Sequence, residues 1–130
     1  MKRLLLDTHT FLWWLADDPA LGVRARQEIG RGDNLVFISA VSVWEIAIKR
    51  AIGKLSVPEG IEETVTEERF IGLPVSLHHA TRAGVLPPHH RDPFDRMLIA
   101  QAQSEGLILV TGDGVFERYG IEVLSISARS

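Results

Sequence analysis

Residues 35–48 read LVFISAVSVWEIAI, and this stretch contains both kinds of element from which the predicted fold is built. Residues 35–38 form a continuous apolar run with the length of a buried strand. Ser39 follows as a helix N-cap, and the next residues favour a helix from Ala40 to Ile52 that ends at Gly53. A buried strand that leads directly into a helix is half of a βαβ unit, so this stretch predicts a parallel sheet.

The same order of strand and helix recurs on both sides of this stretch. Further strands are predicted at residues 4–6, 71–75 (interrupted by Pro74), 107–110 and 121–126. Helices are predicted at residues 8–16, 19–30, 58–69 and 93–104, and from Ser76 to a point before Pro87. This alternation predicts an α/β fold, a three-layer α/β/α sandwich with a central parallel sheet, in a single domain over residues 1–130.

The composition narrows the classes of function. Hydrophobic residues make up 45% and charged residues 24% of the chain, as in ordinary globular proteins. Cysteine is absent, which excludes disulfides, zinc–cysteine sites and a thiol nucleophile. The formal net charge of −3 argues against a broad basic surface for nucleic acid and leaves room for a local site.

No segment has the pattern of a membrane anchor or a secretory signal. The apolar run at residues 4–6 ends at Asp7, short of the roughly 7–15 residues that a signal peptide needs. No apolar run approaches the roughly 18 residues of a membrane span. We therefore expect a cytoplasmic protein with no membrane partner.

Two acids follow predicted strands. Asp7 comes directly after residues 4–6, and Asp113 lies in the turn after residues 107–110. Ligands of open parallel sheets sit outside the carboxyl ends of the strands, so the fold places both acids at the same edge. Taken singly, each is equally well a turn residue or a helix N-cap.

Glu45 is the most informative acid, because its helix is apolar nearly all round and is therefore buried. A buried carboxylate costs several kcal/mol unless it is paired or bound to a cation. The alternative is an ion pair with Lys49 four residues later, which contributes about 0.2–0.5 kcal/mol on an exposed face and would not offset burial.

Asp92 and Asp95 flank the start of the helix predicted at residues 93–104. Asp92 has the alternative role of an N-cap, and Asp95 that of an acid favoured by the helix dipole. Carboxylates that converge on one edge raise each other's pKa unless a cation compensates. Oxygen ligands without cysteine select Mg²⁺ or Mn²⁺, and two such ions can promote hydrolysis of a phosphodiester.

The chain resembles PIN-domain ribonucleases, and more closely the VapC-like toxins of bacterial toxin–antitoxin pairs. The resemblance spans almost the whole length and is specific in the order and spacing of its segments. The segments that carry it are Leu5-Leu6-Asp7-Thr8-His9, residues 38–46 (ISAVSVWEI), residues 92–100 (DPFDRMLIA) and Leu109-Val110-Thr111-Gly112-Asp113.

The resemblance implies a parallel sheet flanked by helices and a metal-dependent endoribonuclease. It makes Asp7, Glu45, Asp95 and Asp113 the catalytic, metal-binding quartet. Thr8 and Thr111 would support the site, and Asp92 would contribute through water. The implied reaction is hydrolysis of an RNA phosphodiester, in which the carboxylates hold Mg²⁺ or Mn²⁺ and do not act as nucleophiles.

The resemblance also implies two protein partners, a second copy of the chain and a cognate antitoxin. Residues 11–15 (FLWWL) are apolar around a predicted helix, and an exposed apolar patch typically marks a partner site. Two alternatives remain at this stage: a non-catalytic partner-binding member of the fold, and a nuclease directed at DNA. Preference for RNA rests on the resemblance alone.

Several basic residues have two interpretations. His89, His90, Arg91 and Arg96 flank Asp95 and would either contact RNA phosphates or form a solvated loop, and a cluster of Lys49, Arg50 and Lys54 has the same ambiguity. His9 is a candidate neighbour of the site. The pair His78-His79, with no acidic partner nearby in the sequence, is expected to be structural.

Overall fold

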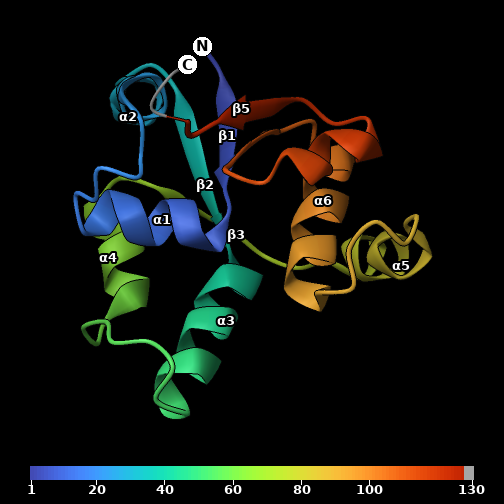
Figure 1. The fold of residues 1–130 in the computed structure, drawn as a ribbon, viewed down its shortest axis with the longest axis horizontal. Helices are drawn as coiled ribbons and strands as arrows, with labels where there is room; N and C mark the ends of the chain where they lie inside the picture. The colour runs from blue at the N-terminus through green and yellow to red at the C-terminus, as the bar shows by residue number, and fades with distance from the viewer. Residues whose placement is uncertain (128–130) are drawn as a thin grey trace.

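Five parallel strands form the centre of the computed structural model, which describes residues 1–127 (Figure 1). The strand order is β3-β2-β1-β4-β5. The strands are β1 (Arg3–Leu6), β2 (Leu35–Ser39), β3 (Ile71–Leu73), β4 (Ile108–Thr111) and β5 (Val123–Ser125). The chain continues to one side of β1 through β2 and β3, and later returns to its other side through β4 and β5. The crevice between β1 and β4 is therefore the place where such a sheet binds ligands.

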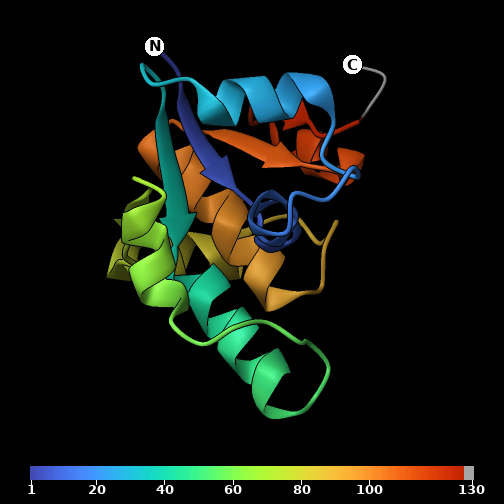
Figure 2. The ribbon, with the colours of Figure 1, turned by 90° about the vertical axis from the view of Figure 1, so that its left-hand side faces the viewer.

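Helices cover both faces of the sheet, which confirms the predicted three-layer sandwich (Figures 1 and 2). One face carries α1 (Thr8–Leu15), α2 (Val23–Gly30) and α4 (Ile61–Glu67). The other carries α6 (Pro93–Glu105) and the 3-10 helix η1 (Gly114–Tyr119), with α5 (Leu77–Val85) packed on α6. The long helix α3 (Ala40–Ala51) extends beyond the carboxyl edge of the sheet. Within residues 1–127, no helix combines the length and apolar character that crossing a bilayer requires.

The central strand feeds both layers of the core. Leu4 and Leu6 of β1 pack with residues of α1 and α2, whereas Leu5 points to the opposite face and packs with residues of α6. All three side chains are fully buried. This alternation is the period of two expected of a strand that is covered on both faces.

The helix predicted at residues 19–30 is shorter than expected and begins at Val23. The Asp18 side chain accepts a hydrogen bond from the Ala20 amide, and the Gly22 amide donates to the Ile126 carbonyl at 2.8 Å. These two bonds hold the chain in a turn before the helix, although Leu21 still reaches the core. The helix predicted at 58–69 is likewise trimmed to α4, and the short helix η1 was not predicted.

Arg96 holds the connection between α5 and α6 together. Its guanidinium donates hydrogen bonds of 2.8–3.2 Å to four backbone carbonyls, those of Ala83, Leu86, Pro87 and His90. The interpretation of Arg96 as a phosphate contact is therefore wrong, because its donors are used to fix the loop.

His79 has the structural role that was expected of it, although it also has an acidic partner from a distant part of the sequence. Its buried ring lies with Nε2 2.9 Å from the Glu105 carboxylate at the end of α6. Its Nδ1 accepts a hydrogen bond from the Ser76 amide, which completes the N-cap of α5. Glu105 is twenty-six residues away, so sequence proximity gave no sign of this pair.

We predict that Arg96→Gln lowers the free energy of unfolding by about 2 kcal/mol, because four backbone carbonyls, three of them in partly buried hydrogen bonds, lose a charged donor. Urea denaturation monitored by circular dichroism measures the effect. Arg91→Gln is the matched control, since Arg91 is exposed and makes no side-chain hydrogen bond within the described residues. Equal stability of the two variants would contradict this role of Arg96.

Candidate functional site

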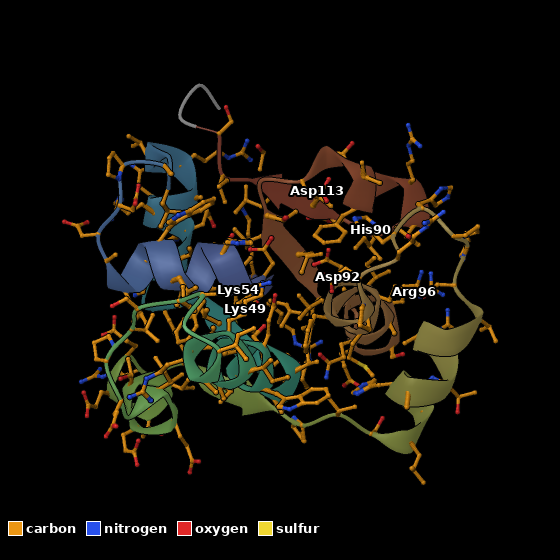
Figure 3. The ribbon with its side chains drawn as sticks, turned by 60° about the horizontal axis from the view of Figure 1, so that its bottom comes forward. Lys49, Lys54, His90, Asp92, Arg96 and Asp113 are labelled. Carbon is orange, nitrogen blue, oxygen red and sulfur yellow. The ribbon has the colours of Figure 1, made fainter. Side chains whose placement is uncertain are left out.

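Five acids lie at the carboxyl edge of the sheet and at nearby helix ends, and we refer to them as the acidic rim. Asp7 follows β1 and caps α1, and Asp113 follows β4 and caps η1. Glu45 lies in α3, which follows β2. Asp92 and Asp95 lie at the start of α6, and Figure 3 views the helix from this N-terminal end, where Asp92 is labelled. The topology thus brings acids from four regions of the sequence to one edge.

Asp7 is buried and fixed by two hydrogen bonds. One carboxylate oxygen accepts from the Thr10 amide at 2.8 Å, as an N-cap does. The other accepts from the Thr111 hydroxyl at the end of β4. Thr111 also accepts from the Asp113 amide at 3.1 Å, so it links the first and the last acid of the rim.

Glu45 is 5% exposed, as its apolar helix predicted, and it forms the ion pair with Lys49 that was the alternative interpretation. Its Oε1 accepts from the Thr8 hydroxyl at 2.7 Å, and its Oε2 accepts from Lys49 Nζ at 2.6 Å. Thr8 lies 2.9 Å from the Ser42 hydroxyl, which sequence analysis missed. Ser42 precedes Glu45 by three residues and shares its helix face, which is the signal that would have found it.

Asp95 has a different environment from the other acids. Within residues 1–127 its carboxylate makes no hydrogen bond and no ion pair. Burial, followed by the negative charge of Asp92 and smaller contributions from Glu45 and Asp7, raises the pKa of Asp95 to about 7, against a lowering effect of His90. These charges act on Asp95 because the four carboxylates converge.

Asp92 is the exposed N-cap of α6, as its alternative role predicted. Its carboxylate accepts from the Phe94 amide at 2.8 Å and from the Asp95 amide at 3.3 Å. The cap places Asp92 directly beside Asp95. Capping and a contribution to the rim are therefore compatible for this residue.

Asp113 is held by His90, a contact that the sequence did not predict. One carboxylate oxygen accepts from the Val115 amide at 2.9 Å, and the other lies 3.0 Å from His90 Nε2. His90 Nδ1 lies 3.0 Å from the Tyr119 hydroxyl, and its ring stacks on Phe116 at 4.6 Å. Burial acts to raise the pKa of Asp113, but the bonds from His90 and Val115 bring it below its usual value.

The rim has the donors of a site for a hard cation, although some of them are turned to internal partners. No three His, Cys, Asp or Glu side chains of the described residues are arranged to hold a metal ion as they stand. Glu45 faces Lys49 and Asp113 faces His90, which accounts for this. The all-oxygen donor set and the uncompensated charge of Asp95 nevertheless fit Mg²⁺ or Mn²⁺.

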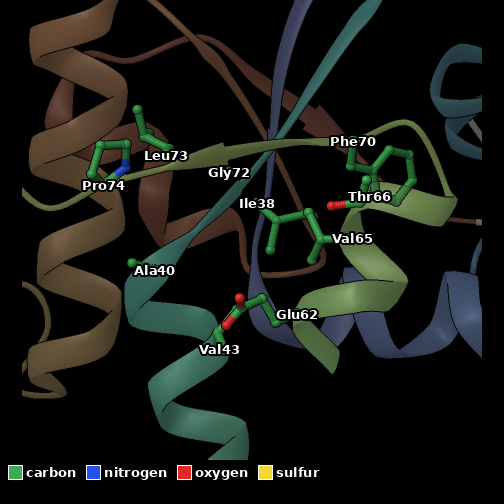
Figure 4. Close-up of a pocket in the computed structure, with 10 residues that line it drawn as sticks. All are labelled: Ile38, Ala40, Val43, Glu62, Val65, Thr66, Phe70, Gly72, Leu73 and Pro74. Atoms are coloured by element: carbon green, nitrogen blue, oxygen red, sulfur yellow. The ribbon is translucent and has the colours of Figure 1, made fainter. Parts of the chain in front are cut away.

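Two hollows lie away from the rim acids. Figure 4 shows one of about 330 Å³ beside β3 and α4, with a mainly apolar lining that includes Val65 and Phe70. A groove of about 580 Å³ runs between α1 and the segment 55–64. Leu12, Trp13, Leu55, Val57 and Ile61 give it its apolar lining. His9 also lines this groove, with its ring 5.7 Å from that of Trp13.

Comparison with known proteins gives a consistent result. Residues 4–122, which include the whole acidic rim, match the PIN domain family. Ribonuclease VapC22 of Mycobacterium tuberculosis is 36% identical over 121 residues, which are 87% of this chain and 88% of that protein.

Solved structures share the fold. One match is the structure of VapBC2 from Rickettsia felis bound to a DNA fragment from its promoter. The match has a TM-score of 0.71 at 17% sequence identity and covers 95% of this chain and 98% of the matched chain. DNA-bound VapBC from Salmonella typhimurium has a TM-score of 0.66 at 24% identity and covers 97% of this chain and 99% of that one.

We predict that Asp95→Asn stabilises the metal-free protein at pH 8. An acid whose pKa is raised from 3.8 to about 7 on folding lowers stability as the pH rises through that window. The gain in Tm should therefore be present at pH 8 and absent below pH 4.

Differential scanning fluorimetry with and without millimolar Mg²⁺ measures this effect. Mg²⁺ should raise the Tm of the wild type more than that of the variant. Glu63→Gln, which removes an exposed acid of α4, is the control and should change neither value. A loss of stability in Asp95→Asn at pH 8 would contradict the assignment of repulsion at the rim.

Proposed function

The chain belongs to the PIN domain family, and on that premise we propose that it is a metal-dependent endoribonuclease, the toxin of a toxin–antitoxin pair. The observation that carries the proposal is the convergence of Asp7, Glu45 and Asp92 on Asp95, with its raised pKa. Such a group of acids is stabilised by a bound cation. The substrate class comes from the relative with 36% identity, which is a ribonuclease by name.

Four acids take the catalytic and metal-holding roles in this proposal: Asp7, Glu45, Asp95 and Asp113. Asp92 is an additional ligand through water. When bound, Mg²⁺ or Mn²⁺ supplies positive charge to the phosphodiester and lowers the pKa of water. Thr8 and Thr111 orient the carboxylates of Glu45 and Asp7, and His90 fixes that of Asp113. The chain needs no covalent nucleophile for this chemistry.

The partners follow from the same premise. We assign the apolar groove between α1 and residues 55–64 to a cognate antitoxin, because half-buried apolar side chains such as Trp13 and Leu55 line it. The solved complexes named above are of toxin–antitoxin type, which supports such a partner. A second copy of the chain, a cytoplasmic location and a single domain over residues 1–130 complete the proposal.

We predict that the purified protein, freed of any partner, cleaves total tRNA or ribosomal RNA into discrete fragments with Mg²⁺ or Mn²⁺. EDTA should abolish the cleavage. Asp7→Asn should reduce it at least about 100-fold and remain folded by circular dichroism, because the substitution is isosteric and keeps an oxygen for the Thr10 amide. Gel electrophoresis of labelled RNA measures the rate.

Single-stranded and flap DNA are the comparison substrates. If only DNA is cleaved, the protein is a DNA-directed nuclease and the proposed substrate class is wrong. A folded protein that binds Mn²⁺ and cuts neither nucleic acid would favour a non-catalytic, partner-binding role. Full activity of Asp7→Asn would contradict the catalytic role proposed for the acidic rim.

We further predict that the protein purified without a partner forms a homodimer. Size-exclusion chromatography with light scattering should give twice the chain mass of 14.4 kDa. Trp13→Ser, in the groove, serves as a comparison and should keep the dimer, because the groove is assigned to the antitoxin. A monodisperse, stable monomer would contradict the proposed assembly.

A further inference from the structure

Lys49 lies in the last turn of α3, one turn after Glu45, and contacts this acid of the rim from the solvent side. Its Nζ lies 2.6 Å from Glu45 Oε2. The Glu45 side chain is 7% exposed and that of Lys49 is 37% exposed, so the ammonium caps a buried carboxylate at the surface. The Lys54 amide donates to the Lys49 carbonyl at 2.8 Å, so the two lysines are close along the chain where α3 ends, and both are labelled in Figure 3.

The ion pair between Lys49 and Glu45 differs in burial from an ordinary surface ion pair. The carboxylate of this pair is almost fully buried, whereas the ammonium lies partly at the surface beside it. An ordinary surface ion pair has no such setting. The neighbouring pair Arg50–Glu59, for example, joins side chains that are 40% and 86% exposed. Lys49 is therefore the cation through which the metal-free rim balances part of its charge.

We propose that Lys49 is a built-in cation of the acidic rim, which competes with a divalent metal for Glu45 and binds an oxygen of the RNA phosphate. This inference rests on the proposed nuclease function. A divalent cation that takes Glu45 weakens the hold of that carboxylate on Lys49. The ammonium then keeps its place at the rim but becomes available to an anion.

The chemistry of the ammonium suits this second task. An ammonium has three N–H donors, and within the described residues Lys49 uses them for Glu45 alone. Phosphate oxygens are strong acceptors for such donors. Negative charge on these oxygens grows during attack on phosphorus, so a cation fixed beside the rim stabilises the transition state more than the bound substrate.

The first measurement is a Mn²⁺ titration of the apo protein, followed by electron paramagnetic resonance. Lys49→Met keeps an apolar stem of similar length and removes the charge. We expect it to bind Mn²⁺ roughly tenfold more tightly, because the substitution removes both a like charge near the metal and a competitor for Glu45. Lys49→Arg should bind Mn²⁺ close to the wild-type affinity, and so should the matched control Lys54→Met.

The second measurement is RNA cleavage at saturating Mn²⁺. Despite its tighter metal binding, Lys49→Met should lose about 100-fold in kcat, as for the loss of one donor to a developing oxyanion. Lys49→Arg should recover most of this rate. A residue with a purely structural role would not raise metal affinity and lower turnover at the same time.

The outcomes separate this inference from the function on which it rests. A folded wild type that binds no Mn²⁺ would overturn both. A wild type that binds Mn²⁺ and cuts RNA, with unchanged Mn²⁺ affinity or unchanged kcat in Lys49→Met, would overturn the role of Lys49 alone.

If Lys49→Met shows no cooperative melt, the wild type itself provides the test. Lysine occurs at positions 2, 49 and 54, so the side-chain methylene signals of labelled lysine are simple to assign by NMR. Addition of Mg²⁺ should shift the Lys49 signal and leave that of Lys54 in place. An unmoved Lys49 signal would overturn the proposal.

Discussion

The cost of burying several carboxylates close to one another at the carboxyl edge of one sheet is the constraint on which the rest of this structure depends. The chain relieves it with local partners that are already part of the fold. Asp7, Asp92 and Asp113 each cap a helix, where backbone amides and the helix dipole favour a negative charge. Glu45 has Thr8 and Lys49 as partners, and Asp113 also has His90. The Asp95 carboxylate lies in the first turn of α6 but has no hydrogen-bond or ion-pair partner within the described residues, so the uncompensated charge of the rim is concentrated on it.

The sequence predicts the fold well wherever burial alone decides the structure. Residues 4–6 and 35–38 are apolar without interruption because the sheet is covered on both faces, and that pattern locates β1 and β2 within about a residue. Glu45 stands out for the same reason, as one charge in an otherwise apolar helix. Ser39, Ser76 and Asp92 cap helices as expected. Predicted ends are less accurate at residues 19–22, where side-chain and long-range hydrogen bonds decide the path of the chain.

Contacts that depend on the path of a loop are beyond such reasoning. His90 meets Asp113 and Tyr119 because Arg96 draws four carbonyls of the α5–α6 connection around its guanidinium. Neither the histidine nor the arginine has a sequence pattern that distinguishes this arrangement from a solvated basic loop. The partners of His90 and Arg96 are more than five residues away in the sequence. The path of a loop produces no periodic sequence pattern from which such contacts could be predicted. His90 and Arg96 therefore support the acidic rim, whereas Arg91 is exposed.

Lys49 in α3 and Lys54 just after it are therefore relevant to how a polyanion would approach the acidic rim. The chain has a formal net charge of −3, and its acids at the rim repel phosphate. Arg96 donates to backbone carbonyls and Arg50 is paired with Glu59, whereas Arg91, next to Asp92, is exposed and makes no side-chain hydrogen bond within the described residues. Lys49 and Lys54 lie together at one side of the rim, and Lys54 is exposed. Under the proposed nuclease function, a phosphodiester backbone would meet three cations beside the acids: Lys49 next to Glu45, Lys54, and the exposed Arg91 next to Asp92.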